Sequence, residues 1–116
     1  MIQKAGYLGI VVNDLESATA FYRDTLGVAV DETESAPGEF TVFNLDGGTV
    51  LALQAGTEIP SDQGFEPAVV VDDADATYAL WKSRGAEMLD EPRDLPFGRA
   101  FMLKTPEGHV LRVYQA

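Results

Sequence analysis

Residues 5–12 alternate between two sets of side chains, and the apolar spacing then widens to three or four residues up to Gly27. The alternation predicts a strand whose odd-numbered residues face one side and whose even-numbered residues face the other. The wider spacing predicts an amphipathic helix with Asp14 as its N-cap. The side chains expected on the buried face of this helix are Leu15, Ala18, Phe21, Tyr22 and Leu26.

The same design returns in residues 66–85, which align with residues 7–26 at an offset of 59 (66 − 7). The second copy predicts a strand over 66–71 and a helix capped by Asp73, with Leu80 and Trp81 on its core side. Because the apolar pattern and the turn chemistry repeat together, we interpret the chain as an internal duplication with a cleft between the two copies.

The remaining apolar runs are short and bounded by Gly, Pro, Asp and Ser, which is typical of strands and turns. They predict an α+β fold of two paired β-α-β-β-β modules, each a curled mixed sheet with a helix on its outer face. The chain then forms a single domain, with module one at about 1–56, a linker at about 57–65 and module two at about 66–116. Further strands are expected at 28–34, 39–45, 49–55, 87–89, 99–104 and 109–115, and a loop at 91–96.

Composition narrows the possible partners. The chain has 116 residues, of which 46% are hydrophobic, enough for one folded core. Its net charge of −11 opposes binding to nucleic acid and to anionic membranes. It contains no cysteine, which excludes a disulfide framework and thiolate metal sites. No signal-peptide pattern or membrane-spanning run is present, so we expect a cytoplasmic protein.

Small and polar residues gather on the strand faces that point away from the predicted helices, which favours a ligand-sized cleft over a simple core. Phe65 and Phe97 lie in linkers at the expected mouth of this cleft, where either ring could stack on a planar ligand. The predicted ligand-binding residues are Tyr7, Ala52, Gln54, Phe65, Glu66, Phe97, Phe101, Arg112 and Tyr114.

Three stretches carry a family resemblance: VVNDLESATAFYRDTLG, VVVDDADATYALWKSRGA and PFGRAFMLKTPEGHVLRVYQ. They resemble the vicinal oxygen chelate superfamily, which includes glyoxalase I, extradiol dioxygenases, fosfomycin-modifying enzymes and bleomycin-resistance proteins. Since the stretches lie near the start, middle and end, the resemblance covers essentially the whole chain. It implies paired modules, a site enclosed by the curled sheet, and a homodimer.

Metal-using members of that superfamily take four ligands from the first and last strands of each module. The corresponding positions here are Tyr7, Ala52, Glu66 and Arg112. Only Glu66 is an ordinary ligand, since Ala52 has no donor atom and the guanidinium of Arg112 is a fixed cation. We therefore predict no metal and no cofactor at this site. The single histidine, His109, follows a Pro-Glu-Gly turn and is expected at the surface.

The leading hypothesis is a non-enzymatic protein, similar to the bleomycin-resistance branch, that binds or sequesters a small aromatic or amphipathic molecule. The alternative is a lyase, isomerase or dioxygenase-type enzyme in which Tyr7, Glu66 and Arg112 supply acid, base and anion-binding groups. A third possibility is a structural or regulatory protein with no small-molecule ligand. Glu66 and Arg112 could pair with each other as an internal strut, or bind the polar end of a ligand.

Overall fold

The computed structural model describes residues 1–116, with the exception of the side chain of Ser61. The chain divides into two compact units. Unit 1 consists of Met1–Gly6 and Pro67–Ala116, and unit 2 of Tyr7–Glu66. The first six residues belong with unit 1 because the first strand of the chain, β1 (Ile2–Val11), neighbours β4 (Phe65–Val71) in the strand order.

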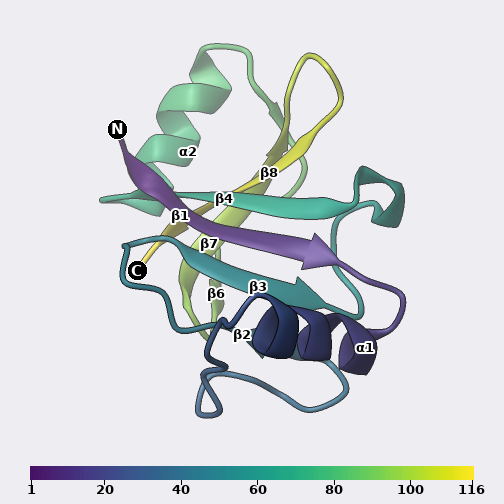
Figure 1. Cartoon of the computed structure of the whole chain (residues 1–116). Helices are drawn as coiled ribbons and strands as arrows, with labels where there is room; N and C mark the ends of the chain where they lie inside the picture. Colours follow the sequence, from purple (N-terminus) through teal and green to yellow (C-terminus); the bar gives the residue numbers. More distant parts are fainter. The chain divides into compact units, whose positions relative to one another are not determined.

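Unit 2 is a small mixed sheet in the order β2-β3-β1, with α1 packed on one face (Figure 1). Asp14 caps α1 as predicted, since its Oδ1 accepts from the backbone nitrogen of Ser17 at 3.0 Å. The ring of Tyr22 stacks on that of Phe43 with centroids 5.3 Å apart, which holds the helix on the sheet. Besides part of β1, unit 2 contains α1 (Leu15–Ala20), a π-helical turn (Phe21–Thr25), β2 (Phe40–Val42), β3 (Val50–Gln54) and a 3-10 turn (Ser61–Gln63).

The predicted buried face of the first helix is wrong at two positions. Phe21 is 51% exposed and Leu26 is 54% exposed. The cause is the π-helical turn, in which the backbone nitrogen of Leu26 bonds to the carbonyl of Phe21, five residues earlier. This wider turn shifts the helical phase, so Tyr22 faces the sheet while Phe21 and Leu26 face solvent.

The predicted strand over 28–34 is also wrong, because this segment makes only one isolated bridge, between Val30 and Phe43. A turn centred on Asp31 replaces the ladder. Its Oδ1 accepts from the backbone nitrogens of Thr33 and Glu34, and its carbonyl accepts from the hydroxyl of Ser35. Such local side-chain bonds compete with strand pairing.

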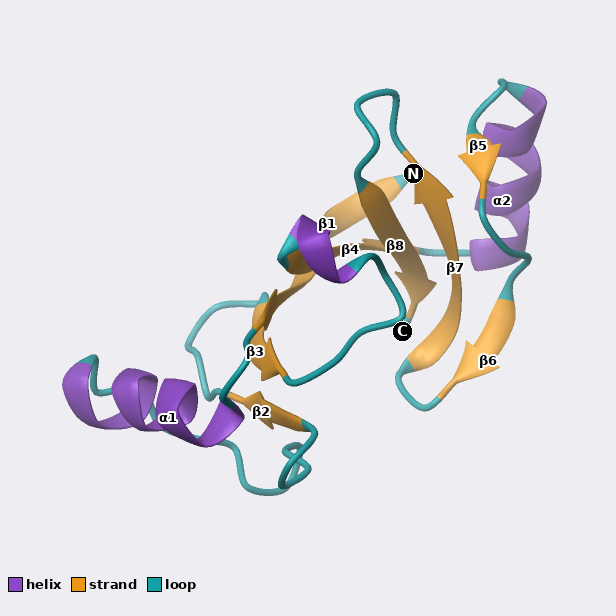
Figure 2. Cartoon of the chain, turned by 90° about the vertical axis from the view of Figure 1, so that its right-hand side faces the viewer, coloured by secondary structure: helices purple, strands orange, loops and turns teal.

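Unit 1 has the strand order β1-β4-β8-β7-β5, and α2 lies on one face (Figure 2). Strand β6 pairs with the start of β7 and β5 with its end, both on the edge of β7 opposite β8. Its core cluster is built around Phe101, which is 0% exposed and meets the rings of Tyr78 and Trp81 edge to face. The predicted N-cap Asp73 accepts from the backbone nitrogen of Ala76 at 3.0 Å. The remaining elements are α2 (Ala74–Ser83), β5 (Glu87–Met88), β6 (Arg93–Leu95), β7 (Gly98–Lys104) and β8 (Val110–Gln115).

Two predictions for unit 1 are corrected. Residues 93–95 form β6 rather than part of a loop, because Arg99 on β7 bonds both Asp94 (3.0 Å) and Asp75 on α2 (2.7 Å). The two prolines, at 92 and 96, flank this short strand and so remove none of its own backbone donors. Leu80 is exposed, and Trp81 alone takes the core position expected for both.

The predicted α+β class is confirmed by this mixed arrangement of strands with two helices. None of the described helices has the length and apolar character that crossing a bilayer would require.

Candidate functional site

In unit 2, the face of β1 and β3 that was predicted to bind a ligand is the face opposite α1. Thr41 contacts α1 through Thr19 and pairs with Leu53, so Leu53 and its register partner Ile10 share the helix side. Alternation then places Tyr7, Gly9, Ala52 and Gln54 on the other side, as predicted.

Gln54 connects three parts of this face. Its Oε1 accepts from the Tyr7 hydroxyl at 3.0 Å, and its Nε2 donates to the carbonyl of Gly56 at 3.2 Å. The side chain lies directly over Gly9, where any Cβ would collide with Gln54 Oε1. Gly9 is therefore required for Gln54 to reach Tyr7, which explains why a glycine interrupts the strand.

Glu66, at the start of β4, is buried with only 6% exposed. Its Oε1 accepts from the Thr57 hydroxyl at 2.8 Å, and Thr57 Oγ1 in turn accepts from the backbone nitrogen of Ile59. Sequence reasoning missed Thr57 because it lies in the predicted linker, outside any periodic element. The only sequence signal is a hydroxyl residue placed just after the polar end of a strand. Phe65 is half-buried, and its carbonyl accepts from Gln63 Nε2 at 2.9 Å.

In unit 1, Arg112 and Tyr114 lie on the face of β8 opposite α2. Their neighbours Leu111 and Val113 contact the core cluster under the helix, so alternation turns Arg112 and Tyr114 the other way, as predicted. Arg112 is 4% exposed and lies in register with Ala68 on β4 and Met102 on β7. A cation this deeply buried is unusual in a fold of this size.

Phe101 does not belong with this group. It points to the α2 side, is 0% exposed, and packs in the core cluster against the rings of Tyr78 and Trp81. Its prediction as a ligand-binding residue is corrected on that ground. The reason is alternation along β7, since Phe101 and Leu103 share the helix face while Ala100 and Met102 take the other.

A tight turn joins β6 to β7 (Figure 2). Phe97 lies at its tip, because Leu95 pairs with Gly98. The guanidinium of Arg112 lies over its ring at 5.5 Å, and Tyr114 meets it edge to face at 5.4 Å. Two contacts therefore fix the orientation of the ring, yet 48% of the residue stays exposed. We call Phe97, Arg112 and Tyr114 the aromatic platform.

The turn holds its shape because Gly98 packs against the last strand. A Cβ at Gly98 would collide with the backbone carbonyl of Gln115, and its φ of +143° lies in the region that favours glycine. The Phe-Gly pair in the sequence is thus the local cause of the exposed ring.

Burial raises the pKa of the Tyr114 phenol above its ordinary value of 10.0. A raised phenol pKa means that the folded state holds this proton more tightly than the unfolded chain. Its contribution to stability is fully present below about pH 10 and is lost as the pH rises through the folded pKa.

We expect the urea concentrations at the midpoint of unfolding at pH 9 and pH 11 to differ less for Tyr114→Phe than for the unmodified protein. Equal differences would contradict the assignment.

The nine predicted site residues thus fall into two groups by unit, and Phe101 leaves its group for the core. That the groups form one hollow stays a prediction. Unit 2 holds Tyr7, Ala52, Gln54, Phe65 and Glu66, and unit 1 holds Phe97, Phe101, Arg112 and Tyr114.

The four positions that correspond to metal ligands do not fit a divalent cation. Ala52 is wholly buried and has no donor atom, and Arg112 carries a positive charge that lies over the ring of Phe97. Over the described residues, no three or more His, Cys, Asp or Glu side chains gather as a metal group would require. His109 is exposed in its turn, where its backbone nitrogen donates to Thr105. Absence of a metal stays a prediction that rests on this donor set.

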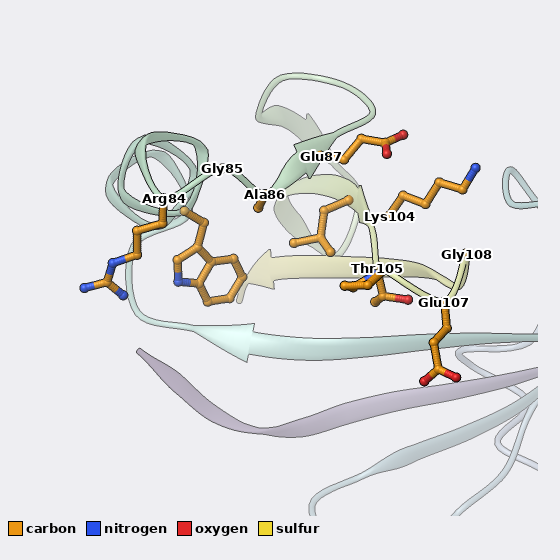
Figure 3. Close-up of a pocket in the computed structure, with 11 residues that line it drawn as sticks. Arg84, Gly85, Ala86, Glu87, Lys104, Thr105, Glu107 and Gly108 are labelled. Atoms are coloured by element: carbon orange, nitrogen blue, oxygen red, sulfur yellow. The ribbon is translucent and has the colours of Figure 1, made fainter.

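Unit 1 also has an open groove of about 810 Å³ between the end of α2 and the β7–β8 turn, which the sequence did not predict. Trp81 and Leu103 supply its apolar surface, and Arg84, Glu87, Lys104 and Glu107 lie around it (Figure 3). The charges of the rim are of both signs and therefore favour no single class of ligand.

Comparison with known proteins places these features in context. The family model described as the Glyoxalase/Bleomycin resistance protein/Dioxygenase superfamily matches residues 4–113. The phenazine antibiotic resistance protein EhpR of Enterobacter agglomerans is 26% identical over 113 residues, which covers 90% of this chain and 85% of that protein.

Two solved structures extend the comparison. A superfamily member from Vibrio splendidus has a TM-score of 0.79 at 23% identity, covering 95% of this chain and 97% of its own. A variant of methylmalonyl-CoA epimerase from Streptomyces coelicolor, in complex with 2-nitronate-propionyl-CoA, has a TM-score of 0.73 at 26% identity. That match covers 100% of this chain and 99% of the epimerase.

Proposed function

Because the chain belongs to the Glyoxalase/Bleomycin resistance protein/Dioxygenase superfamily, we propose that it binds a small planar aromatic compound, without a metal and without altering it. The observation that carries this proposal is the aromatic platform. The ring of Phe97 contacts Arg112 and Tyr114, while about half of the residue stays exposed to solvent. An exposed ring fixed in place loses little entropy when a second ring stacks on it.

The distant relationship to a phenazine antibiotic resistance protein supports the choice of ligand. Phenazines are flat, fused aromatic rings, which match a stacking surface. The positive charge of Arg112 beside that surface favours a compound that carries a carboxylate, because opposite charges attract strongly where water is excluded. The protein would then protect its host by sequestration. A homodimer in the cytoplasm, free of nucleic acid and membrane, is part of the same proposal.

The proposal is tested by calorimetric titration with phenazine-1-carboxylate and by thermal unfolding in its presence. We expect saturable binding and recovery of the compound unchanged. A ligand at 100 times its dissociation constant should add about 2.7 kcal/mol to the stability of the protein. No heat of binding and no shift in melting temperature over a series of phenazines would contradict the proposed function.

An isomerase is the second candidate function, and the full-length similarity to methylmalonyl-CoA epimerase favours it. The buried carboxylate of Glu66 would remove a proton next to a carbonyl group, as a general base. Incubation with methylmalonyl-CoA in heavy water separates the two candidates. Deuterium incorporation that Glu66→Gln abolishes would establish the enzyme, whereas an unlabelled substrate would exclude this epimerase-type reaction.

A further inference from the structure

The hydroxyl of Tyr114 extends from the aromatic platform along the face of unit 1 opposite α2. Across the part of the chain that the structure describes, no side chain or backbone group forms a hydrogen bond with it. In that part, every fully enclosed side-chain nitrogen or oxygen does have a partner, so this hydroxyl is open to solvent. Its proton and its lone pairs are therefore available to a ligand.

A glycine on β1 makes room for this hydroxyl. A Cβ at Gly6 would collide with the Tyr114 hydroxyl and with the side chain of Val70, which is the register partner of Tyr114 on β4. The φ of Gly6 is not positive, so space rather than backbone conformation explains the glycine. All three residues belong to unit 1, so the position of the hydroxyl is determined within one unit.

We infer that the Tyr114 hydroxyl donates a hydrogen bond to the ligand stacked on Phe97, so that the protein selects planar compounds with an acceptor, such as a ring nitrogen, at the edge of the ring system. The inference rests on the proposed function for the aromatic class of the ligand, and it adds the group that the rings must carry. Phe97 and Tyr114 both lie in unit 1.

The aromatic platform has a geometry that allows stacking and this hydrogen bond together. The ring centroids of Phe97 and Tyr114 lie 5.4 Å apart, and the ring planes are inclined by 88°. Stacking on Phe97 uses the face of a ligand, whereas the lone pairs of a ring nitrogen point outward from its edge. A fused three-ring compound also extends beyond the single ring of Phe97. One compound can therefore make both contacts at the same time.

Charge determines the direction of this hydrogen bond. A hydroxyl can donate or accept, but the guanidinium of Arg112 lies 5.5 Å from the centroid of the same Phe97 ring. Its positive charge attracts lone pairs and repels the N–H and O–H hydrogens of a ligand. Because burial raises the pKa of Tyr114, the phenol keeps its proton through neutral and moderately alkaline pH. The hydroxyl is therefore a donor over that range.

The test compares phenazine-1-carboxylate with anthracene-1-carboxylate by calorimetric titration, since the two share shape and charge and differ in the two ring nitrogens. Anthracene is the more apolar ring system, so the ratio of the two affinities is compared between variants. In Tyr114→Phe we expect the ratio of phenazine to anthracene affinity to fall about tenfold, equivalent to one net hydrogen bond of about 1.4 kcal/mol. The matched control is Tyr78→Phe, whose ring packs on Phe101 on the α2 side and which should keep the ratio.

A ratio that Tyr114→Phe leaves unchanged or raises would overturn the inference. If neither compound binds, the proposed function fails, and urea unfolding of the ligand-free protein at pH 7 decides whether the hydroxyl is free. Tyr114→Phe should then leave the midpoint unchanged, whereas Tyr7→Phe should lower it by losing the bond from its hydroxyl to Gln54 Oε1. A midpoint lowered as much in Tyr114→Phe as in Tyr7→Phe would reveal an internal partner and refute the inference.

Discussion

Replacing Phe97 by alanine is expected to weaken binding of phenazine-1-carboxylate about thirtyfold while the protein stays folded. The stacking contact and the buried apolar area of the ring jointly contribute about 2 kcal/mol to the binding free energy. Because Phe97 is 48% exposed, its removal leaves no closed cavity. Loss of its contacts with Arg112 and Tyr114 should cost about 1–2 kcal/mol of unfolding free energy. Calorimetric titration measures the first effect, and urea unfolding measures the second.

The matched control is Phe21→Ala. Phe21 is 51% exposed, nearly the same fraction as Phe97, but it lies on the solvent side of the first helix in unit 2. The Phe21→Ala substitution should leave the affinity for phenazine-1-carboxylate unchanged. Equal losses of affinity in the two variants would mean that exposed rings act only through general hydrophobicity. Unchanged affinity in Phe97→Ala would show that the aromatic platform does not bind the ligand.

Replacing Arg112 by glutamine should abolish the preference for a carboxylate-bearing phenazine over phenazine itself. The attraction between two close opposite charges contributes about 1.5 kcal/mol or more, so the affinity for phenazine-1-carboxylate should fall at least about tenfold. Affinity for uncharged phenazine should fall much less, since its ring nitrogens are neutral acceptors and carry no charge for the guanidinium to attract. Arg112 is 4% exposed and lies over Phe97, so the protein should also lose about 1–3 kcal/mol of stability.

Arg23→Gln is the corresponding control, because Arg23 is an exposed arginine whose Nε donates to the neighbouring Asp24 at 2.8 Å. It removes the same charge from the protein and should preserve the ratio of the two affinities. A ratio that survives in Arg112→Gln would assign Arg112 to an internal strut, the other reading that the sequence leaves open.

Much of the fold was predictable because local chemistry and tertiary packing agree in the duplicated stretches. Asp14 and Asp73 cap their helices as expected, and alternation placed Tyr7 and Arg112 on the faces opposite those helices. The errors arise where a long-range contact or an irregular turn determines the local structure. A π-helical turn redirects Phe21 and Leu26, and the Arg99 bonds to Asp75 and Asp94 convert a predicted loop into β6.

The strand faces on which the candidate site residues lie were predictable, and the contacts of those residues were much less so. The alternating pattern identified Gln54 and Glu66, but it could not show that Gln54 lies over Gly9 or that Thr57 reaches Glu66. Those contacts depend on side-chain packing between strands and a loop, which periodicity does not encode. Phe101 was placed wrongly because its aromatic type outweighed its position on the helix side of β7.

The measurement that bears most directly on the central claim is a phenazine-1-carboxylate titration of protein prepared with and without a chelator, with the metal content of both samples determined. The account predicts the same affinity in the two samples and only trace amounts of zinc, nickel, manganese or iron. A stoichiometric metal, with binding that a chelator abolishes and the metal restores, would contradict it.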